Sequence, residues 1–248
     1  MTSPEATPDK RHGLARVLSK HGLCSRSSAA QWIRDGRVAI AGQVVRAPEH
    51  PVDASCVDRI SVDGQPLASP RRHYLMLNKP RGLVTTATDE LGRDTVYRCF
   101  KDAGLGWVAP VGRLDKASEG LLLFTNDPAW AARITDPATG PFKTYHVQVD
   151  AIPGAACLRR LEAGLECEGE RLRASSTAVL RSGTRNAWLE IVLDEGRNRQ
   201  IRRLLAAVDL QVLRLVRVAV GTVALGDLAK GAWRHLDAAE ARLLAEPG

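Results

Sequence analysis

The strongest constraint on the fold is a set of strand patterns in the second part of the chain, separated irregularly by helical patterns. Apolar or alternating runs predict strands at 74–80, 120–127, 143–149, 187–193 and 213–220. Helical patterns lie at 128–134, 153–161, 197–208 and 237–245. Strands outnumber helices and do not alternate with them strictly. We therefore expect an α+β domain with a mixed, largely antiparallel sheet rather than a doubly wound one.

The first 70 residues follow a different pattern, which predicts a small module ahead of the sheet domain. Residues 1–10 are polar and contain prolines, so we expect a mobile tail. Within 11–70, two short helices precede two tight hairpins, and Ser25 is placed to cap the second helix. The polar stretch 68–73 is the predicted linker, and 71–248 is the predicted second domain.

Positive charge is distributed unevenly along the chain. The 35 Lys and Arg residues exceed the 28 Asp and Glu residues, which gives a net charge of +7. One cluster, opposed only by Asp35, comprises Arg11, Arg16, Lys20, Arg26, Arg34, Arg37 and Arg46. A second cluster, within 195–217, comprises Arg197, Arg199, Arg202, Arg203, Arg214 and Arg217. Either cluster alone is compatible with a solvated helix face, but two on separate elements are typical of polyanion-binding proteins.

Several other classes of protein are disfavoured by the composition. The longest uninterrupted apolar run, 204–208, is five residues, whereas a membrane-spanning helix needs about 20. The first residues lack the apolar segment of a secretory signal. The five cysteines form no C-x-x-C pair and the histidines are scattered, which argues against a disulfide framework or a metal site. We expect a cytoplasmic protein without a membrane anchor or metal.

The segment 13–45 resembles the alpha-L RNA-binding module, which occurs in a small-subunit ribosomal protein and in several RNA-modifying enzymes. The matching residues are Ser25, Arg26, Gly36, Arg37 and Val38, whereas Gly13 stands where the family usually has arginine. Helix N-termini and arginine forks suit the backbone of structured RNA. The predicted RNA contacts in this module, 11–70, are Arg11, Arg16, Lys20, Ser25, Arg26 and Arg37.

Four later segments resemble, in order, the RsuA/RluB/RluE/RluF family of ribosomal RNA pseudouridine synthases. They are YLMLNKPRGLVTT (74–86), GRLDKASEGLLLFTND (112–127), KTYHVQV (143–149) and EGRNRQIRRLLAAV (195–208). Ser118 is a mild departure, because threonine is commoner there. The resemblance implies that 71–248 is a catalytic domain that isomerises uridine to pseudouridine without a cofactor.

The resemblance also implies three catalytic residues. Asp115 matches the essential carboxylate, which either attacks C1′ of the ribose or removes its C2′ proton; we favour proton removal. Tyr145 matches the tyrosine that stacks on the target base, and Arg202 matches the basic partner of the aspartate. Taken singly, these residues have simpler explanations, as a turn former, a packed strand residue and a surface arginine.

The target base must leave its stack to reach Asp115, so the flanking backbone must be held. The candidates for this role, each of which is equally well explained as a surface cation, are Arg113, Lys143, Arg197, Arg199 and Arg203. The expected partner is ribosomal RNA, 23S rather than 16S, and the favoured state is a monomer.

Two other functions remain open at the level of the sequence. A non-catalytic RNA-binding or ribosome-assembly factor would share the basic clusters but would not need Asp115. An RNA N-glycosidase would release free uracil. Glu119, four residues after Asp115, is a formal second acid for such an enzyme, although the sequence does not define the separation of the two carboxylates.

Overall fold

The structure is a computed structural model that describes residues 12–68, 70–101 and 103–246. The predicted mobile tail, 1–10, and the predicted RNA contact Arg11 lie outside the described residues. The chain divides into two units. The first holds the described residues up to His73 together with 105–109 and 126–128, and the second holds the rest. The end of the first long stretch, His73, lies three residues beyond the predicted domain boundary at residue 70.

In the first unit, two helices pack beside small antiparallel sheets. Ser25 caps the second helix as predicted, because its Oγ accepts a hydrogen bond from the backbone N–H of Ser28 at 3.0 Å. Leu14, Leu18 and Ile33 are fully buried in the core of this unit. Its elements are β1 (His12–Gly13), α1 (Leu14–Lys20), α2 (Arg26–Arg34), β2 (Val38–Ile40), β3 (Gln43–Val44), β4 (Pro51–Val52), η1 (Ala54–Arg59), β5 (Ile60–Val62) and β6 (Gln65–Pro66).

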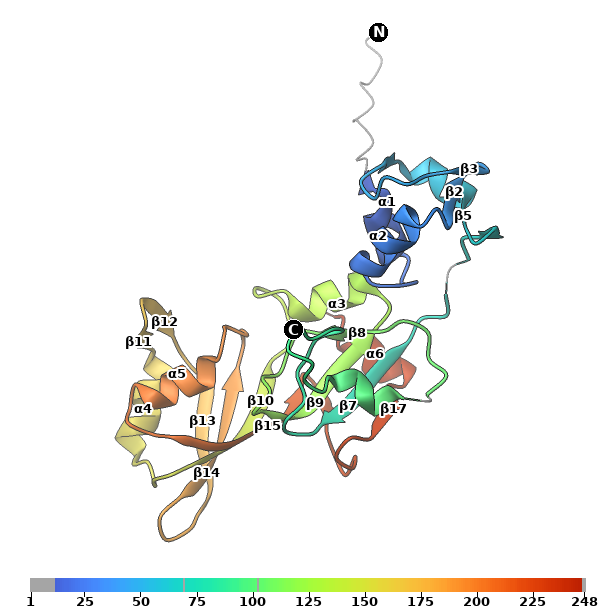
Figure 1. Cartoon of the computed structure of the whole chain (residues 1–248). Helices are drawn as coiled ribbons and strands as arrows, with labels where there is room; N and C mark the ends of the chain where they lie inside the picture. The colour runs from blue at the N-terminus through green and yellow to red at the C-terminus, as the bar shows by residue number, and fades with distance from the viewer. Residues whose placement is uncertain (1–11, 69, 102, 247–248) are drawn as a thin grey trace. The chain divides into compact units, whose positions relative to one another are not determined.

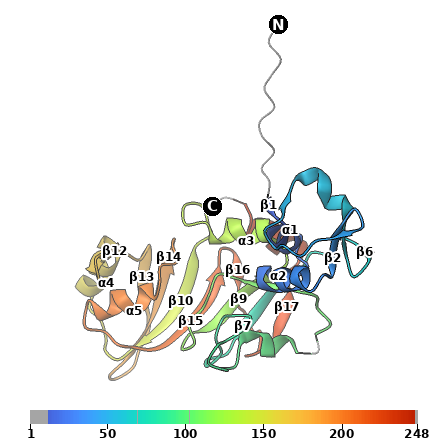
Figure 2. The same ribbon diagram turned by 45° about the horizontal axis from the view of Figure 1, so that its top comes forward.

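The second unit is built on a nine-stranded sheet (Figures 1 and 2). The strand order is β13-β14-β10-β15-β9-β7-β17, with β16 beside β15 and β8 beside β9. Only β9 and β15 run parallel along this path, so the prediction of a mixed, largely antiparallel sheet in an α+β domain is confirmed. The strands are β7 (Tyr74–Lys79), β8 (Ala109–Val111), β9 (Glu119–Thr125), β10 (Lys143–Val149), β13 (Ser176–Ser182), β14 (Ala187–Leu193), β15 (Val212–Val220), β16 (Val223–Ala224) and β17 (Trp233–His235).

Burial along the strands follows the sequence pattern. β9 is buried throughout, its polar ends Glu119 and Thr125 included, whereas β14 buries every second residue and β10 does so from Tyr145 on. In both views α4 and α5 lie beside the β13–β14 end of the sheet (Figures 1 and 2). The remaining elements of this unit are η2 (Val96–Phe100), α3 (Pro128–Thr135), α4 (Ala155–Ala163), β11 (Leu165–Cys167), β12 (Glu170–Leu172), α5 (Gln200–Ala206) and α6 (Ala238–Leu243).

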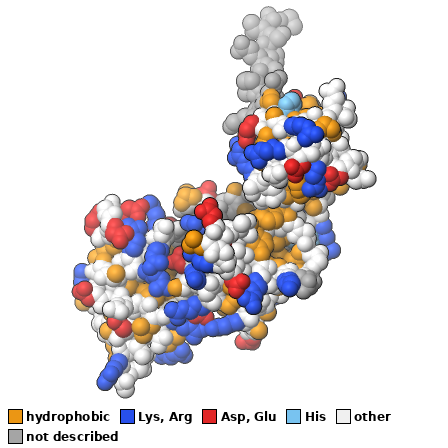
Figure 3. Space-filling view, viewed as in Figure 1, with side chains coloured by type: hydrophobic (Ala, Val, Ile, Leu, Met, Phe, Trp, Pro, Cys, Tyr) orange, Lys and Arg blue, Asp and Glu red, His pale blue; other side chains and the backbone are white. Residues whose placement is uncertain are grey.

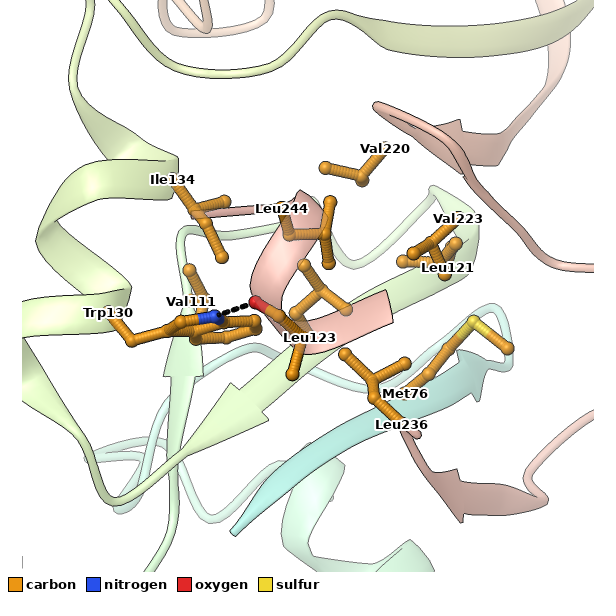
Figure 4. Close-up of a cluster of buried hydrophobic side chains, with 11 residues drawn as sticks. Met76, Val111, Leu121, Leu123, Trp130, Ile134, Val220, Val223, Leu236 and Leu244 are labelled. Atoms are coloured by element: carbon orange, nitrogen blue, oxygen red, sulfur yellow. Dashed lines mark hydrogen bonds between the residues drawn. The ribbon is translucent and has the colours of Figure 1, made fainter. Parts of the chain in front are cut away.

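A buried cluster joins α3 and α6 to the sheet (Figure 4). Leu121 and Leu123 of β9 pack here with Trp130 of α3 and Leu244, which follows α6. The Trp130 indole N–H donates a hydrogen bond to the carbonyl of Ala241 at 2.7 Å, so the ring satisfies its polar atom inside an apolar cluster.

The structure corrects two predicted helix starts and adds elements that were not predicted. The helix predicted at 197–208 begins only at Gln200, because Arg199 has a left-handed backbone with φ of 49°. The helix predicted from Pro153 begins at Ala155. The edge strand β13 and the β11–β12 hairpin were missed; β13 is exposed at nearly every position and therefore has no apolar alternation.

We expect Leu123→Ala to lower the free energy of unfolding by about 2–5 kcal/mol, because it empties a fully packed position in the cluster of Figure 4. Urea denaturation measures this change. The control is Leu180→Ala, since Leu180 is 46% exposed on β13 and should cost less than about 0.5 kcal/mol. Equal effects of the two substitutions would contradict the packing described here.

Candidate active site

A cavity of about 680 Å³ opens in the second unit beside the sheet. Segments far apart in the sequence line it: the loop before β9, strands β10 and β15, and the segment from Glu195 into α5. The three predicted catalytic residues, Asp115, Tyr145 and Arg202, all belong to this lining. Four predicted RNA contacts also line it, namely Arg113, Lys143, Arg197 and Arg199. Figure 3 shows Lys and Arg side chains gathered over the part of the surface formed by α5.

A buried lysine binds the backbone of the loop that carries Asp115. The Nζ atom of Lys79, at the end of β7, donates hydrogen bonds to the carbonyls of Asp115 (3.2 Å), Ser118 (2.9 Å) and Pro80 (3.1 Å). Lys79 is 0% exposed, and burial lowers its pKa to about 8, although the charges of Asp115 and Glu119 act in the opposite direction. Three carbonyl acceptors match the three donors of an ammonium group, so the loop backbone has a defined position.

The turn after β7 adds further hydrogen bonds to the same loop. The Thr85 hydroxyl donates to the carbonyl of Leu114 at 2.7 Å, and the Gly82 N–H donates to the carbonyl of Lys116 at 2.8 Å. Sequence analysis quoted the segment that contains Lys79 but assigned no role to it. The signal that could have found it is a lysine at the end of a strand otherwise expected to be buried, since such a charge needs partners.

Glu119 follows the loop and does not share the cavity with Asp115. Its side chain is 4% exposed, and Arg214 donates to both carboxylate oxygens at 2.7 and 3.0 Å. Lys230 also contacts this carboxylate, at 2.6 Å. The hydrogen bonds from Arg214 hold the pKa of Glu119 at about 2, despite the opposing effect of burial. Because Glu119 does not line the cavity, the described residues do not place it as a second acid for glycoside chemistry.

Gly120 allows the strand after the loop to lie against β15. Its φ is +98°, and a Cβ atom built there would lie 2.2 Å from the carbonyl oxygen of Arg217. Any other residue would therefore push β9 away from β15 at the point where the two strands pair in parallel. This close approach brings the Asp115 loop and the Arg217 side of β15 to the same cavity.

The carboxylate of Asp115 faces an excess of positive charge. Its side chain is 42% exposed, and its nearest ion-pair contact joins Oδ2 to Nη1 of Arg199 at 4.0 Å. Arg202 forms no ion pair within 4.0 Å with any described residue, and its buried Nε has no hydrogen-bond partner. Burial and the charges of Arg199 and Arg81 lower the pKa of Arg202, whereas Asp115 raises it. The predicted pairing of Arg202 with Asp115 stays a prediction, and Arg199 is the arginine in contact.

Tyr145 forms part of the cavity wall on β10. It is buried and lies directly opposite Arg217 in the β10–β15 pairing. Arg217, which sequence analysis assigned only to a charge cluster, is buried as well, and its Nε donates to the carbonyl of Leu121 at 2.7 Å. Lys143 is half-buried nearby, where burial and the Arg217 charge lower its pKa. The wall therefore combines an aromatic ring with two cations.

Two of the predicted RNA contacts also serve the protein's own structure. Arg203 is 14% exposed and holds the turn between β11 and β12 through Glu168 (3.0 Å) and Glu170 (2.6 Å). It does not line the cavity. Arg197 does line it, and is paired with Glu195 at 3.0 Å and Glu170 at 3.3 Å. An RNA contact by either residue has to compete with these carboxylates.

In the first unit, some of the predicted RNA contacts are bound to other protein groups and some are not. Arg16 and Lys20 are exposed four residues apart on α1 and form no ion pair with another described residue. Arg26 is exposed and pairs with Glu49 at 3.3 Å. Arg37 donates to both oxygens of Asp63 and lies over the ring of Trp32, 5.0 Å from its centroid. The hydroxyl of Ser25 is used for the helix cap.

In the part of the chain that the structure describes, no group of three or more His, Cys, Asp or Glu side chains is placed to hold a metal ion. None of its helices has both the length and the apolar character needed to cross a bilayer.

Comparisons with known proteins agree with this geometry. A family model for RNA pseudouridylate synthase matches residues 73–207, and an S4 domain model matches residues 13–55. An uncharacterized RNA pseudouridine synthase of Aquifex aeolicus is 37% identical, over 91% of this chain and 90% of the relative. Ribosomal large subunit pseudouridine synthase B of Bacillus subtilis is 33% identical, over 93% and 94%. A crystal structure of a pseudouridylate synthase aligns with a TM-score of 0.65 at 29% identity, over 94% and 99%.

We expect Glu119 to make the protein sensitive to acid. Its pKa in the folded chain, about 2, lies below the usual 4.5, so the stabilisation is complete above pH 4.5 and is lost as the pH falls toward 2. The full loss is on the order of 3 kcal/mol, from about 1.4 kcal/mol per pKa unit. Urea unfolding at pH 5, 4 and 3 should show a shallower decline for Glu119→Gln than for the unsubstituted chain, and identical declines would refute the assignment.

Proposed function

The chain belongs to the RNA pseudouridylate synthase family, and from this we propose that it isomerises a uridine of ribosomal RNA, 23S rather than 16S, with Asp115 as the essential catalytic group. The observation that carries the proposal is the convergence of Asp115, Tyr145 and Arg202 on one cavity. These residues come from three segments that are well separated in the sequence, and a merely RNA-coating protein has no need to bring them together.

The reaction breaks the N-glycosidic bond, turns the uracil and joins its C5 to C1′ of the same ribose. In the route we favour, Asp115 takes the C2′ proton while the uracil leaves with the bonding electrons, so that a glycal forms. After the base turns, C5 bonds to C1′ and the proton returns to C2′. The C5 proton is then lost and N1 gains one, so the atoms and electrons balance. A carboxylate suits this task because positive character develops on the sugar during cleavage.

The surrounding residues suit a nucleotide drawn out of its stack. In this proposal, uracil stacks on the ring of Tyr145, which lines the cavity, and the tyrosine hydroxyl assists removal of the C5 proton. Arg199 contacts the carboxylate of Asp115 at 4.0 Å, and Arg202 lines the same cavity. The hydrogen bonds from Lys79 fix the backbone of the loop from which the Asp115 carboxylate projects. The cavity's volume of about 680 Å³ lies within the range of small-ligand pockets.

Ribosomal RNA is the proposed substrate because of the positive net charge of the chain and the name of one of its relatives. The net charge of +7 suits a polyanion, and the Bacillus subtilis relative is named for the large ribosomal subunit. We further propose that the protein acts in the cytoplasm and as a monomer.

The deciding experiment maps the pseudouridines of both ribosomal RNAs in cells with and without the protein, by carbodiimide labelling and primer extension. We expect one 23S position to lose its pseudouridine. A full set of pseudouridines in the deletion strain would leave only a non-catalytic assembly role, and a lost 16S position would reverse the choice of RNA. Release of free uracil, seen by chromatography, would indicate an N-glycosidase instead.

We expect Asp115→Asn to abolish pseudouridine formation and to leave RNA affinity within a few fold, because the side chain acts on the ribose rather than on the backbone. Single-turnover assays and filter binding measure the two effects. Asp94→Asn is the control, since Asp94 is exposed, pairs with Arg98 and does not line the cavity. Equal losses of activity and affinity in Asp115→Asn would contradict its assigned role.

We expect the double variant Arg16→Ala/Lys20→Ala to flatten the salt dependence of RNA binding. Each phosphate contact contributes roughly 0.7–0.9 to the slope of log affinity against log salt, so two contacts remove roughly 1.4–1.8. Arg242→Ala is the control, because Arg242 is exposed on α6 and pairs with Glu246. An unchanged slope in the double variant would mean that α1 does not contact RNA.

A further inference from the structure

Two arginines at the start of α5 lie near the carboxylate of Asp115, and a third is carried by the turn after β7. Arg199 is the residue before α5, Arg202 lies within α5, and Arg81 lies in the turn after β7. The other acids of the cavity lining are already engaged. Glu195 binds Arg197 and Gln200, and Asp136 accepts hydrogen bonds from the N–H groups of Ala138 and Thr139. Within the cavity lining, Arg199 and Arg202 therefore have the carboxylate of Asp115 to offset their charge.

Arg81 has a defined place beside the catalytic loop although its own side chain is exposed. Lys79, two residues before Arg81, donates hydrogen bonds to the carbonyls of Asp115 and Ser118. Gly82, the residue after Arg81, donates its N–H to the carbonyl of Lys116. Arg81 is thus carried by a turn that is hydrogen-bonded to the Asp115 loop on both sides. It forms no ion pair with any described residue and does not belong to the cavity lining.

The charge of Arg81 affects Arg202 in the cavity lining, although Arg81 itself does not line the cavity. Its charge is near enough to lower the pKa of Arg202, together with burial and the charge of Arg199. Arg202 also has a buried Nε without a hydrogen-bond partner. Like charges held this close repel one another, and an anion placed between them relieves the repulsion.

We propose that Arg81, with Arg199 and Arg202, forms a subsite for the backbone phosphate adjoining the target uridine. A nucleotide whose ribose reaches Asp115 carries a phosphodiester on each side, only a few bonds from C1′. Planar guanidinium forks match phosphate oxygens in geometry and charge. Arg81 is therefore a positioning residue, which holds the ribose against Asp115 through the backbone. This inference rests on the proposed function, since it takes RNA as the ligand.

The test is a coupling measurement between Arg81 and single phosphates. The ligands are a stem-loop RNA that contains the uridine identified by mapping, and two versions of it with one neutral methylphosphonate, placed on the 5′ or the 3′ side of that uridine. Dissociation constants are measured for the full-length chain, for Arg81→Ala and for Arg98→Ala. Arg98 is an exposed arginine of the same region, which pairs with Asp94, and serves as the matched control.

We expect Arg81→Ala to weaken binding of the unmodified RNA about tenfold, and one of the two methylphosphonates to weaken binding by the native chain to a similar extent. In combination, the substitution and that methylphosphonate should cost no more than either alone. Arg81→Lys, which keeps the charge but not the fork, should recover part of the affinity. Arg98→Ala should have no such coupling.

Two outcomes overturn the subsite: no effect of Arg81→Ala, or losses that add fully at both flanking phosphates. Pseudouridine formation by the native chain on the unmodified RNA is scored separately. Its absence would count against the proposed function, whereas the coupling in binding would still report on the phosphate subsite.

Discussion

The active site depends on one ammonium group buried beneath its catalytic loop. Lys79 has no access to solvent, and its three N–H donors are taken up by backbone carbonyls, two of them in the Asp115 loop. Such a charge is costly to bury, and it is retained where the groups that solvate it are themselves required in one position. The loop replaces water around the lysine, and the lysine in turn gives the loop a single backbone arrangement.

The cavity concentrates like charges, and this arrangement has a cost in stability. Burial and the neighbouring charges of Arg199 and Arg81 disfavour the charge of Arg202, and Arg199 adopts a left-handed backbone that a residue with a Cβ atom seldom takes. Ion pairs from Arg203 to Glu168 and Glu170 offset part of this cost, because they tie α5 to the β11–β12 hairpin. Repulsion that is left unrelieved in the free protein strengthens the attraction for a phosphate chain.

Local patterns in the sequence predicted a large part of the structure. The alternation in β10 and β14, the apolar run of β9 and the cap of Ser25 on α2 are all set by neighbours along the chain. The convergence of Asp115 and Tyr145 was predicted only through resemblance. Contacts between residues far apart in the sequence could not be predicted. The ion pair between Glu119 and Arg214, for example, joins residues 95 positions apart. Lys79 was missed because a lysine is ordinarily read as a surface residue, and only its tertiary neighbours show otherwise.

The position of β15 has a consequence for synthesis of the protein. β15 lies between β10 and β9 in the sheet and supplies Arg217 to the cavity, yet it comes from the last fifth of the chain. During translation β9 and β10 emerge long before β15, the strand that lies between them in the sheet. A nascent chain that ends before Arg217 therefore lacks part of the cavity wall. The RNA-binding module is complete far earlier. A growing chain can thus hold RNA before it is able to modify it.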